Sequence, residues 1–336
     1  MSKIGIIGGS GFIGFNLANH LQRRFHVKII DLKPPARNLK NTEYVKCDVR
    51  NFEEVKNAVK DLDLVIHTAI VQIPRINEEK RLGYEVNVTG TQNVCRAIDE
   101  SKSVKGLILT GTWHTIGERE INGIVDESFG YRPDKVEDRA RLYALSKILQ
   151  ENIVRYYDEL SEKIFGILRL GTVLGEGMPE KTAASIFIEQ GLKGQPITPY
   201  KHSIHRPMLY IDIFDVCRAF ELFANKILNY EIVKENNSLH HIINVVYPQP
   251  VTILELSYIV RDALIELSPR APKFSPVIKI VDKGLPCMFS PKDKSKFRVQ
   301  IKKAKEILNL DADRLIPPSE SIKRIINKRL AGIRRE

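Results

Sequence analysis

The sequence has few cysteines and lacks any apolar run long enough to cross a membrane. Its four cysteines, among 336 residues, are far apart, and no two of them form a CxxC pair. This spacing argues against a disulfide scaffold or a metal site and predicts reduced thiols in a cytoplasmic protein. A membrane-spanning helix needs roughly 18 or more apolar residues in succession. The apolar start, residues 1–14, is shorter and ends in a glycine-rich turn, which predicts a buried strand rather than a signal peptide. We therefore expect no membrane association.

Positive charge is concentrated near the end of the chain. The formal net charge is +11, and residues 292–336 hold fourteen Lys and Arg against six Asp and Glu. A basic stretch can contact nucleic acid or an anionic membrane, or attract a phosphate-bearing substrate. Because no aromatic residues alternate with the basic ones and no RNA-binding motif occurs, we interpret this stretch as the solvated surface of amphipathic helices, and we do not expect nucleic-acid binding.

Short apolar segments alternate with helical segments in the first half of the chain. The apolar segments have the composition of buried parallel strands and cover residues 3–7, 27–30, 43–46, 64–67, 106–110 and 163–169. Helical periodicity is found between them, over residues 11–24, 53–60, 85–101 and 138–159. This alternation predicts βαβ units and an α/β fold of the Rossmann type, with a doubly wound parallel sheet.

The pattern changes after residue 175. Helical segments at residues 181–193, 213–225 and 252–267 are separated by proline-rich connections, and further helices are expected at 302–308 and 320–330. We predict a dinucleotide-binding domain over residues 1–175 and a smaller C-terminal lobe over residues 176–336, which binds substrate and carries the basic helices. Residues 241–245 are apolar enough to return to the main sheet.

A glycine-rich turn follows the first predicted strand. Gly8, Gly11 and Gly14 are spaced three residues apart, with Phe12 and Ile13 between the last two. Glycines here permit a tight turn, a close approach of the backbone to a pyrophosphate, and close packing of the following helix on the strand. The positive end of that helix then faces the phosphates.

An acidic residue at the end of the second strand indicates which dinucleotide is bound. Asp31 is placed to accept hydrogen bonds from the adenosine ribose hydroxyls and to repel a 2′-phosphate, which favours NAD over NADP. Lys33 and Arg37 follow closely and leave NADP as the less favoured alternative. Asp48, after the third strand, is placed to meet the adenine edge with Val49 packing on the ring, although a plain turn residue is an alternative for Asp48.

The sequence resembles the extended short-chain dehydrogenase/reductase family, which includes NAD-dependent sugar epimerases and dehydratases. The three-residue glycine spacing has that family's form, and residues 87–93 (Asn-Val-Thr-Gly-Thr-Gln-Asn) match its Asn-Val-x-Gly-Thr-x-Asn helix. The resemblance covers residues 3 to about 220. It implies that Thr68, Ala69 and Asn87 contact the cofactor, together with Thr110. It also implies a homodimer formed through helices at residues 85–101 and 138–159.

The resemblance extends to a catalytic pair, Tyr143 and Lys147, in the segment Tyr-Ala-Leu-Ser-Lys. Residues four apart share one face of a helix, so the phenol and the ammonium both face one pocket. A phenol of normal pKa, roughly 10, cannot act as a base at neutral pH. We expect the lysine cation, with the oxidised nicotinamide, to lower the pKa of Tyr143, and Lys147 also to bind the nicotinamide ribose.

A hydroxyl residue from the end of the fifth strand completes the implied catalytic group. Aligning residues 110–117 with the family's Ser-Ser-x-x-x-Tyr-Gly segment places Thr112 at the catalytic hydroxyl, and Thr110 is the alternative. Dehydratases of this family carry an Asp-Glu pair directly after this hydroxyl, and decarboxylating relatives carry a Glu. Trp113 and His114 stand there instead, which favours simple hydride chemistry. His114 is interpreted as a substrate-contacting or structural residue, with proton transfer as the alternative.

Two later segments resemble the family's contacts to a nucleotide diphosphate. Residues 169–175 resemble Arg-x-x-Asn-x-x-Gly, with Thr172 at the Asn position, and residues 205–212 resemble Arg-Asp-Phe-x-His-Val-Asp, which makes Arg206 the candidate diphosphate clamp. A second clamp arginine expected near residue 283 is absent, and Lys279 and Lys283 are found there.

Three functions follow from these residues. The first is an NAD-dependent epimerase of a nucleotide sugar, with transient hydride removal and Tyr143 as the base. The second is an NAD(P)-dependent dehydrogenase or reductase of a non-nucleotide substrate, such as a 3β-hydroxysteroid or a small metabolite, and the altered diphosphate contacts support it. The third, a non-catalytic dinucleotide sensor, does not explain why Tyr143, Lys147 and Thr112 are all present.

Overall fold

A parallel sheet forms the centre of the protein. The structure, a computed structural model, describes residues 1–267 and 276–333. Its main sheet has seven strands in the order β11-β7-β5-β4-β1-β2-β3, and every neighbouring pair is parallel. The strands are β1 (Lys3–Ile7), β2 (His26–Asp31), β3 (Thr42–Lys46), β4 (Leu64–His67), β5 (Gly106–Thr112), β7 (Ile164–Leu170) and β11 (Ile242–Val245). The α/β Rossmann fold expected from the sequence is confirmed.

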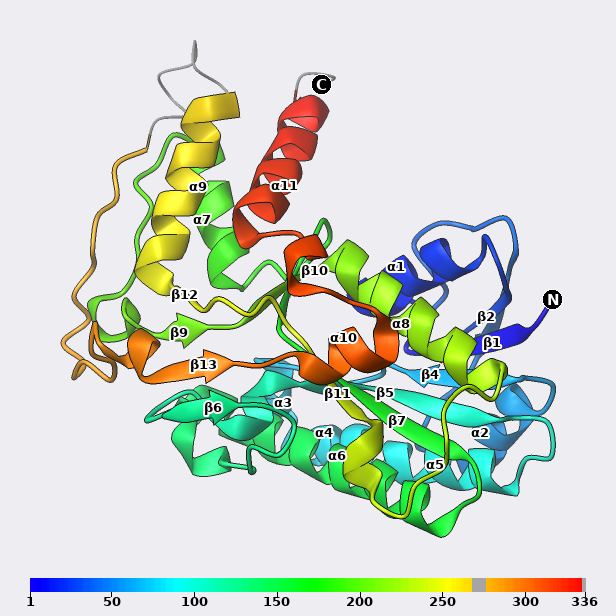
Figure 1. The fold of residues 1–336 in the computed structure, drawn as a ribbon. Helices are drawn as coiled ribbons and strands as arrows, with labels where there is room; N and C mark the ends of the chain where they lie inside the picture. Colours follow the sequence, from blue (N-terminus) through cyan, green and yellow to red (C-terminus); the bar gives the residue numbers. More distant parts are fainter. Residues whose placement is uncertain (268–275, 334–336) are drawn as a thin grey trace.

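Helices cover both faces of this sheet. In Figure 1, α1 (Phe12–Leu21) and α8 (Ile213–Leu228) lie above the sheet, and α2 (Phe52–Val59), α5 (Gly90–Glu100) and α6 (Arg141–Leu160) lie below it. Successive side chains of a strand point to opposite faces, so Leu64 and Ile66 join one core cluster whereas Val65 joins the other. Burial on both faces explains why these strands are continuously apolar.

The predicted elements agree with the structure except near their ends. β5 continues to Thr112, two residues beyond the expected end, so Thr112 is the last residue of a central strand. The helix expected over residues 85–101 begins as a π-helical turn, Glu85–Thr89, before α5, and it follows two short helices, α3 (Arg75–Glu78) and α4 (Lys80–Tyr84). α6 begins at Arg141, after the 3-10 turn Asp138–Ala140.

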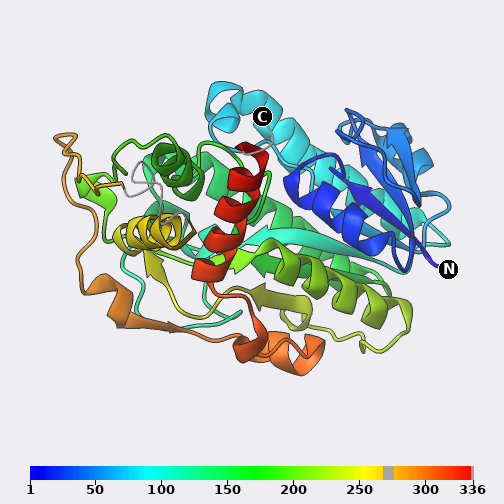
Figure 2. The same cartoon turned by 90° about the horizontal axis from the view of Figure 1, so that it is seen from above.

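The second half of the chain divides between the sheet and a separate lobe. β11 pairs in parallel with β7, α8 packs beside α1, and α10 (Lys302–Leu308) packs beside β11 and α8. The lobe consists of α7 (Ala183–Leu192), α9 (Ile253–Leu267) and α11 (Pro318–Ile333), which pack side by side away from β1–β3 (Figure 2). The basic C-terminal stretch thus contributes to both parts, and its residues 334–336 lie outside the described residues.

Short paired strands connect the lobe to the sheet. They are β8 (Thr172–Leu174) with β10 (Tyr210–Asp212), β9 (Pro207–Met208) with β12 (Val251–Thr252), and β6 (Gly123–Val125) with β13 (Phe297–Val299). Asp212 joins two of the later helices: its buried carboxylate accepts a hydrogen bond from the backbone N–H of Phe214 (2.8 Å), and it also bonds Ser321 and Arg324 of α11. Within the described part of the chain, every helix is too short or too polar to span a bilayer.

Candidate active site

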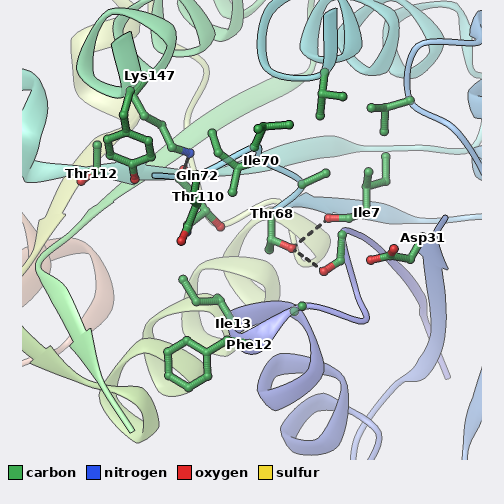
Figure 3. A pocket seen from close by; sticks show the side chains of 18 of the residues that line it. Ile7, Phe12, Ile13, Asp31, Thr68, Ile70, Gln72, Thr110, Thr112 and Lys147 are labelled. Atoms are coloured by element: carbon green, nitrogen blue, oxygen red, sulfur yellow. Dashed lines mark hydrogen bonds between the residues drawn. The ribbon is translucent and has the colours of Figure 1, made fainter. Parts of the chain in front are cut away.

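A cavity of about 650 Å³ opens at the carboxyl ends of the sheet strands. Its wall includes the residues that end or follow β1, β2, β4, β5 and β7, among them Gly8, Asp31, Thr68, Thr112 and Leu170. Open parallel sheets bind their ligands at this edge. In Figure 3, Asp31 lies toward one end of the cavity, and Lys147 and Thr112 lie toward the other.

The glycine turn forms a wall without side chains. Gly8 has a φ of +80°, and a Cβ on Gly14 would lie 2.2 Å from the carbonyl oxygen of Gly8. The backbone therefore tolerates no side chain at either position. Gly11 caps α1 without a side-chain hydrogen bond, so the first N–H groups of the helix remain available to an anion. This cradle, which also includes Phe12 and Ile13, fits the pyrophosphate of a dinucleotide.

Asp31 is held firmly at the end of β2. Its carboxylate accepts hydrogen bonds from the backbone N–H groups of Ser10 (3.0 Å) and Lys33 (3.1 Å). Lys33 also lines the cavity, whereas the guanidinium of Arg37 lies over the ring of Phe15, 5.4 Å from its centroid. A fixed negative charge at this end fits a ribose with free hydroxyls.

Asp48 and Val49 line the same end of the cavity. The carboxylate of Asp48 is bound by Arg50 (2.6 and 3.0 Å), whose hydrogen bonds hold the pKa of Asp48 below its usual value, although burial acts in the opposite direction. Arg50 is itself a cavity residue that the sequence analysis did not single out. The structure therefore presents an ion pair beside Val49, rather than a free acid.

Thr68 and Ala69 line the cavity, whereas Asn87 does not. The hydroxyl of Thr68 bonds the carbonyl oxygens of Ile7 (2.9 Å) and Gly8 (3.0 Å), as Figure 3 shows, and so ties the loop after β4 to the glycine turn. The side chain of Asn87 is fully buried; its oxygen accepts a hydrogen bond from the N–H of Val71, and its nitrogen donates one to the carbonyl oxygen of Val71. Its position therefore suits support of the cavity wall from behind rather than contact with a cofactor.

Tyr143 and Lys147 both line the cavity from α6, as their spacing predicts. The ammonium of Lys147 donates a hydrogen bond to the carbonyl oxygen of Thr110 (2.8 Å), toward which it points in Figure 3. Burial lowers the pKa of Lys147 to about 7, and the charge of Glu151 acts in the opposite direction. The carboxylate of Glu151 is paired with Arg169, which binds it at 2.5 to 3.1 Å, rather than with Lys147.

The chain alone does not lower the pKa of Tyr143, and the expected lowering by Lys147 together with the oxidised nicotinamide stays a prediction. Burial raises this pKa to about 12, and a hydrogen bond with Thr112 only partly offsets the increase. The ammonium of Lys147 is directed at the carbonyl oxygen of Thr110.

Of the two candidate hydroxyls, the structure brings Thr112 to the phenol. Thr112 lines the cavity with Tyr143 and lowers the pKa of its phenol, and its hydroxyl lies 3.2 Å from Nδ1 of His114. Thr110 lines the cavity, but its hydroxyl is buried without a hydrogen-bond partner. Thr172 also lines the cavity, and its hydroxyl accepts a hydrogen bond from the indole of Trp113 (3.3 Å).

Arg206 lies outside the cavity wall. Its side chain is buried, with Nη1 2.6 Å from Glu137 and 3.9 Å from Glu118. Two carboxylates thus hold the guanidinium that the sequence predicted as a diphosphate clamp. Glu118 is a residue that the sequence analysis missed, although its position four residues after His114 was a usable signal.

The fold and this site define a dinucleotide-binding α/β enzyme with a tyrosine–lysine pair. The chain belongs to the NAD dependent epimerase/dehydratase family, whose model matches residues 4–234. This membership confirms the resemblance seen in the sequence. The site fits the cofactor that gives the family its name, because the glycine cradle and Asp31 face one cavity.

Individual relatives agree with this assignment. A protein of Methanocaldococcus jannaschii named "Putative UDP-glucose 4-epimerase" is 30% identical over 246 residues, which are 69% of this chain and 77% of that protein. A 3-beta-hydroxysteroid dehydrogenase of Mycolicibacterium neoaurum is 32% identical over 165 residues, 46% of this chain and 43% of the relative. The chain spans only 41% and 34% of the length of two other relatives.

Solved structures show the same fold. The UDP-glucose 4-epimerase of Thermotoga maritima, solved with UDP-glucose, superposes with a TM-score of 0.77 over 98% of this chain and 99% of that one, at 19% sequence identity.

The position of Asp31 predicts the choice of dinucleotide. NAD should bind at least about tenfold more tightly than NADP, a difference of about 1.4 kcal/mol, because the carboxylate repels a 2′-phosphate. Asp31→Asn, which keeps the shape and removes the charge, should reduce this preference, whereas Asp61→Asn on the surface should leave it intact. Calorimetric titration of the apoprotein measures both affinities, and equal affinities in the unmodified protein would contradict the assignment.

The buried ammonium of Lys147 predicts a cost in stability. Since the pKa is lower in the folded than in the unfolded state, the unfolded chain binds an extra proton between about pH 7 and pH 10, and stability rises with pH over this window. Lys147→Met should therefore raise the melting temperature of the apoprotein, most at pH 7 and below, with the gain shrinking toward pH 10. Scanning calorimetry across pH, with the exposed Lys102→Met as control, tests this. A melting temperature lowered by Lys147→Met at pH 7 would show that the bond to Thr110 outweighs the desolvation.

Proposed function

We propose that the protein is an NAD-dependent epimerase acting on a nucleotide sugar. The observation that carries this proposal is that Tyr143 and Thr112 lie in the wall of the same cavity as the glycine cradle. A secondary alcohol entering there meets a group that can take its proton. NAD, when bound, accepts a hydride and can return it.

In this mechanism the side chains of the chain handle the proton and the positioning. Tyr143 removes the proton of the sugar hydroxyl and later gives it back, and Thr112 lines the cavity beside it. Lys147, fixed by its bond to Thr110, faces the cavity with its ammonium and orients the ribose nearest the reacting carbon. Trp113 and His114 follow Thr112 in place of carboxylates, so elimination of water lacks its acid and base at these positions.

The substrate class is supported by the relatives. The Methanocaldococcus protein carries the name of a UDP-glucose epimerase, and the Thermotoga enzyme was solved with UDP-glucose. The first candidate among substrates is therefore a UDP-hexose whose hydroxyl configuration is inverted.

The burial of Arg206 favours a second candidate. Its side chain lies outside the cavity wall, beside Glu137 and Glu118, which does not favour a contact with the diphosphate of a nucleotide sugar. A net dehydrogenase or reductase of a non-nucleotide hydroxyl or carbonyl compound needs no such contact. The steroid dehydrogenase among the relatives supports this alternative.

The outer face of α6 supports assembly as a homodimer. Leu145, Leu149 and Tyr156 are exposed, and their spacing of four and seven residues places them on one stripe of the helix. Exposed apolar stripes of this kind mark protein–protein contacts. We propose that the stripe packs against the same stripe of a second copy, which makes a two-fold interface.

Tyr143→Phe tests the base. In an assay that follows inversion of UDP-glucose, UDP-glucuronic acid and UDP-N-acetylglucosamine by proton NMR, the variant should lose about a hundredfold to ten-thousandfold in rate while keeping its NAD content. Tyr258→Phe, which deletes an exposed hydroxyl on α9, is the matched control. Near-normal turnover by Tyr143→Phe would reject the mechanism. Oxidation of a steroid or small secondary alcohol, with no UDP-sugar inverted, would establish the second candidate instead.

Leu149→Glu tests the dimer. A charge in the centre of the stripe should convert a particle of twice the 38.3 kDa chain mass into a monomer, measured by light scattering. Tyr258→Glu places the same charge on another exposed site and should leave the mass unchanged. A monomeric unmodified protein would rule the interface out.

A further inference from the structure

A histidine and a buried glutamate continue the hydrogen-bonded chain that starts at Tyr143. The Thr112 hydroxyl, beside the phenol, lies 3.2 Å from Nδ1 of His114. On the other side of the ring, Nε2 lies 3.3 Å from a carboxylate oxygen of Glu118. The rings of His114 and Tyr143 meet edge to face, with centroids 6.0 Å apart. Four polar side chains thus form one connected row.

The glutamate at the end of this row is ionised. Glu118 is 2% exposed, and burial alone would raise its pKa, but the charge of Arg206 and the hydrogen bond from His114 hold it at about 2. Arg206 is held in turn by Glu137. Gly117 aims Glu118 back at the histidine: its φ is +81°, and a Cβ there would lie 2.8 Å from Lys135. The local backbone is therefore shaped for this contact.

The direction of the hydrogen bonds follows from the ionised carboxylate. An ionised Glu118 only accepts, so the neutral imidazole carries its proton on Nε2 and presents a bare Nδ1. Thr112 then donates its hydroxyl proton to Nδ1. After a proton transfer its hydroxyl can donate to the phenolate instead, which agrees with its lowering of the pKa of Tyr143.

We propose that His114 is the proton-relay residue of the reaction, taking the proton of Tyr143 through the hydroxyl of Thr112. This inference rests on the proposed role of Tyr143 as base. The phenol O–H bond breaks as its proton passes to the Thr112 oxygen, while the Thr112 proton moves to Nδ1 of His114. The phenolate then takes the substrate's hydroxyl proton. The imidazolium is paired with Glu118, and reversal of the same steps returns the proton.

The surroundings of His114 agree with this role. Burial raises the pKa of Tyr143 to about 12, so in the chain alone the phenol keeps its proton at neutral pH, and this proton needs an acceptor before the phenol can act as a base. His114 faces Tyr143 from α6 and Glu118 from its own loop, with Arg206 and Glu137 beyond, and Trp113 covers one side of its ring. Its side chain is 19% exposed and lines the cavity, so it can also exchange protons with water there. Arg206 serves the row as a positioning residue for Glu118.

The kinetic test uses His114→Gln in the NAD-loaded enzyme with the UDP-sugar assay. At pH 7, kcat should fall by about a hundredfold or more, with KM and NAD content within about threefold of the unmodified enzyme. The deficit should shrink as pH rises, because the phenol then ionises into solvent. Added imidazole should restore turnover to His114→Ala and not to Tyr143→Phe. His240→Gln removes an exposed histidine that also pairs with a glutamate outside the cavity, and it should change nothing. An unchanged kcat and pH profile in His114→Gln would overturn the relay.

A second measurement needs no substrate. In protein labelled with nitrogen-15 histidine, NMR should show His114 protonated at Nε2 with Nδ1 accepting a hydrogen bond, and Thr112→Val should shift the Nδ1 signal. Glu118→Gln should remove the preference for this tautomer. If these signals appear and no UDP-sugar is turned over, the proposed substrate fails while the hydrogen-bonded row stands. The opposite tautomer, or no response to Thr112→Val, would overturn the relay even in an active epimerase.

Discussion

The buried ammonium of Lys147 is the interaction on which the catalytic geometry depends. Removing a cation from water is costly, and here it is offset by a bond of 2.8 Å to the carbonyl of Thr110 rather than by a free carboxylate. Because the bond joins α6 to β5, it fixes how the helix sits on the strand. One helical turn earlier, Tyr143 is thereby placed beside Thr112, at the end of the same strand. Burial of the Lys147 ammonium thus lowers the stability of the fold, and the same bond gives the Tyr143 phenol a defined position.

Features set by local sequence could be predicted. Strand–helix alternation gave the order of the first elements, because strands buried on both faces must be apolar throughout and helices between them follow a 3.6-residue period. The glycine turn and Asp31 could be located since each follows directly after its strand. The spacing of Tyr143 and Lys147 suffices to place both on one side of α6. The structure brings all of these to one cavity.

Features set by distant partners could not be predicted. The motif around Arg206 predicts a cation facing substrate, yet Glu118 and Glu137 come from a loop that the sequence does not place near it. Asn87 matches a motif as well, but its amide is bonded to the backbone of Val71 and to the hydroxyl of Ser146. Burial raises the pKa of Tyr143, and helical spacing brings Tyr143 and Lys147 to one face without fixing how deeply they are buried or where the ammonium points.

The inward position of Arg206 links substrate recognition to proton transfer. The guanidinium of Arg206 is buried outside the cavity wall, 2.6 Å from Glu137 and 3.9 Å from Glu118, and from there its charge keeps Glu118 ionised. Turning Arg206 toward the cavity would add a cation for phosphate and remove the charge that stabilises Glu118. The carboxylate would then tend to protonate, because burial alone raises its pKa. His114 would lose the acceptor that fixes its tautomer. One side chain therefore cannot serve both purposes, and in this chain it serves the hydrogen-bonded row behind Thr112.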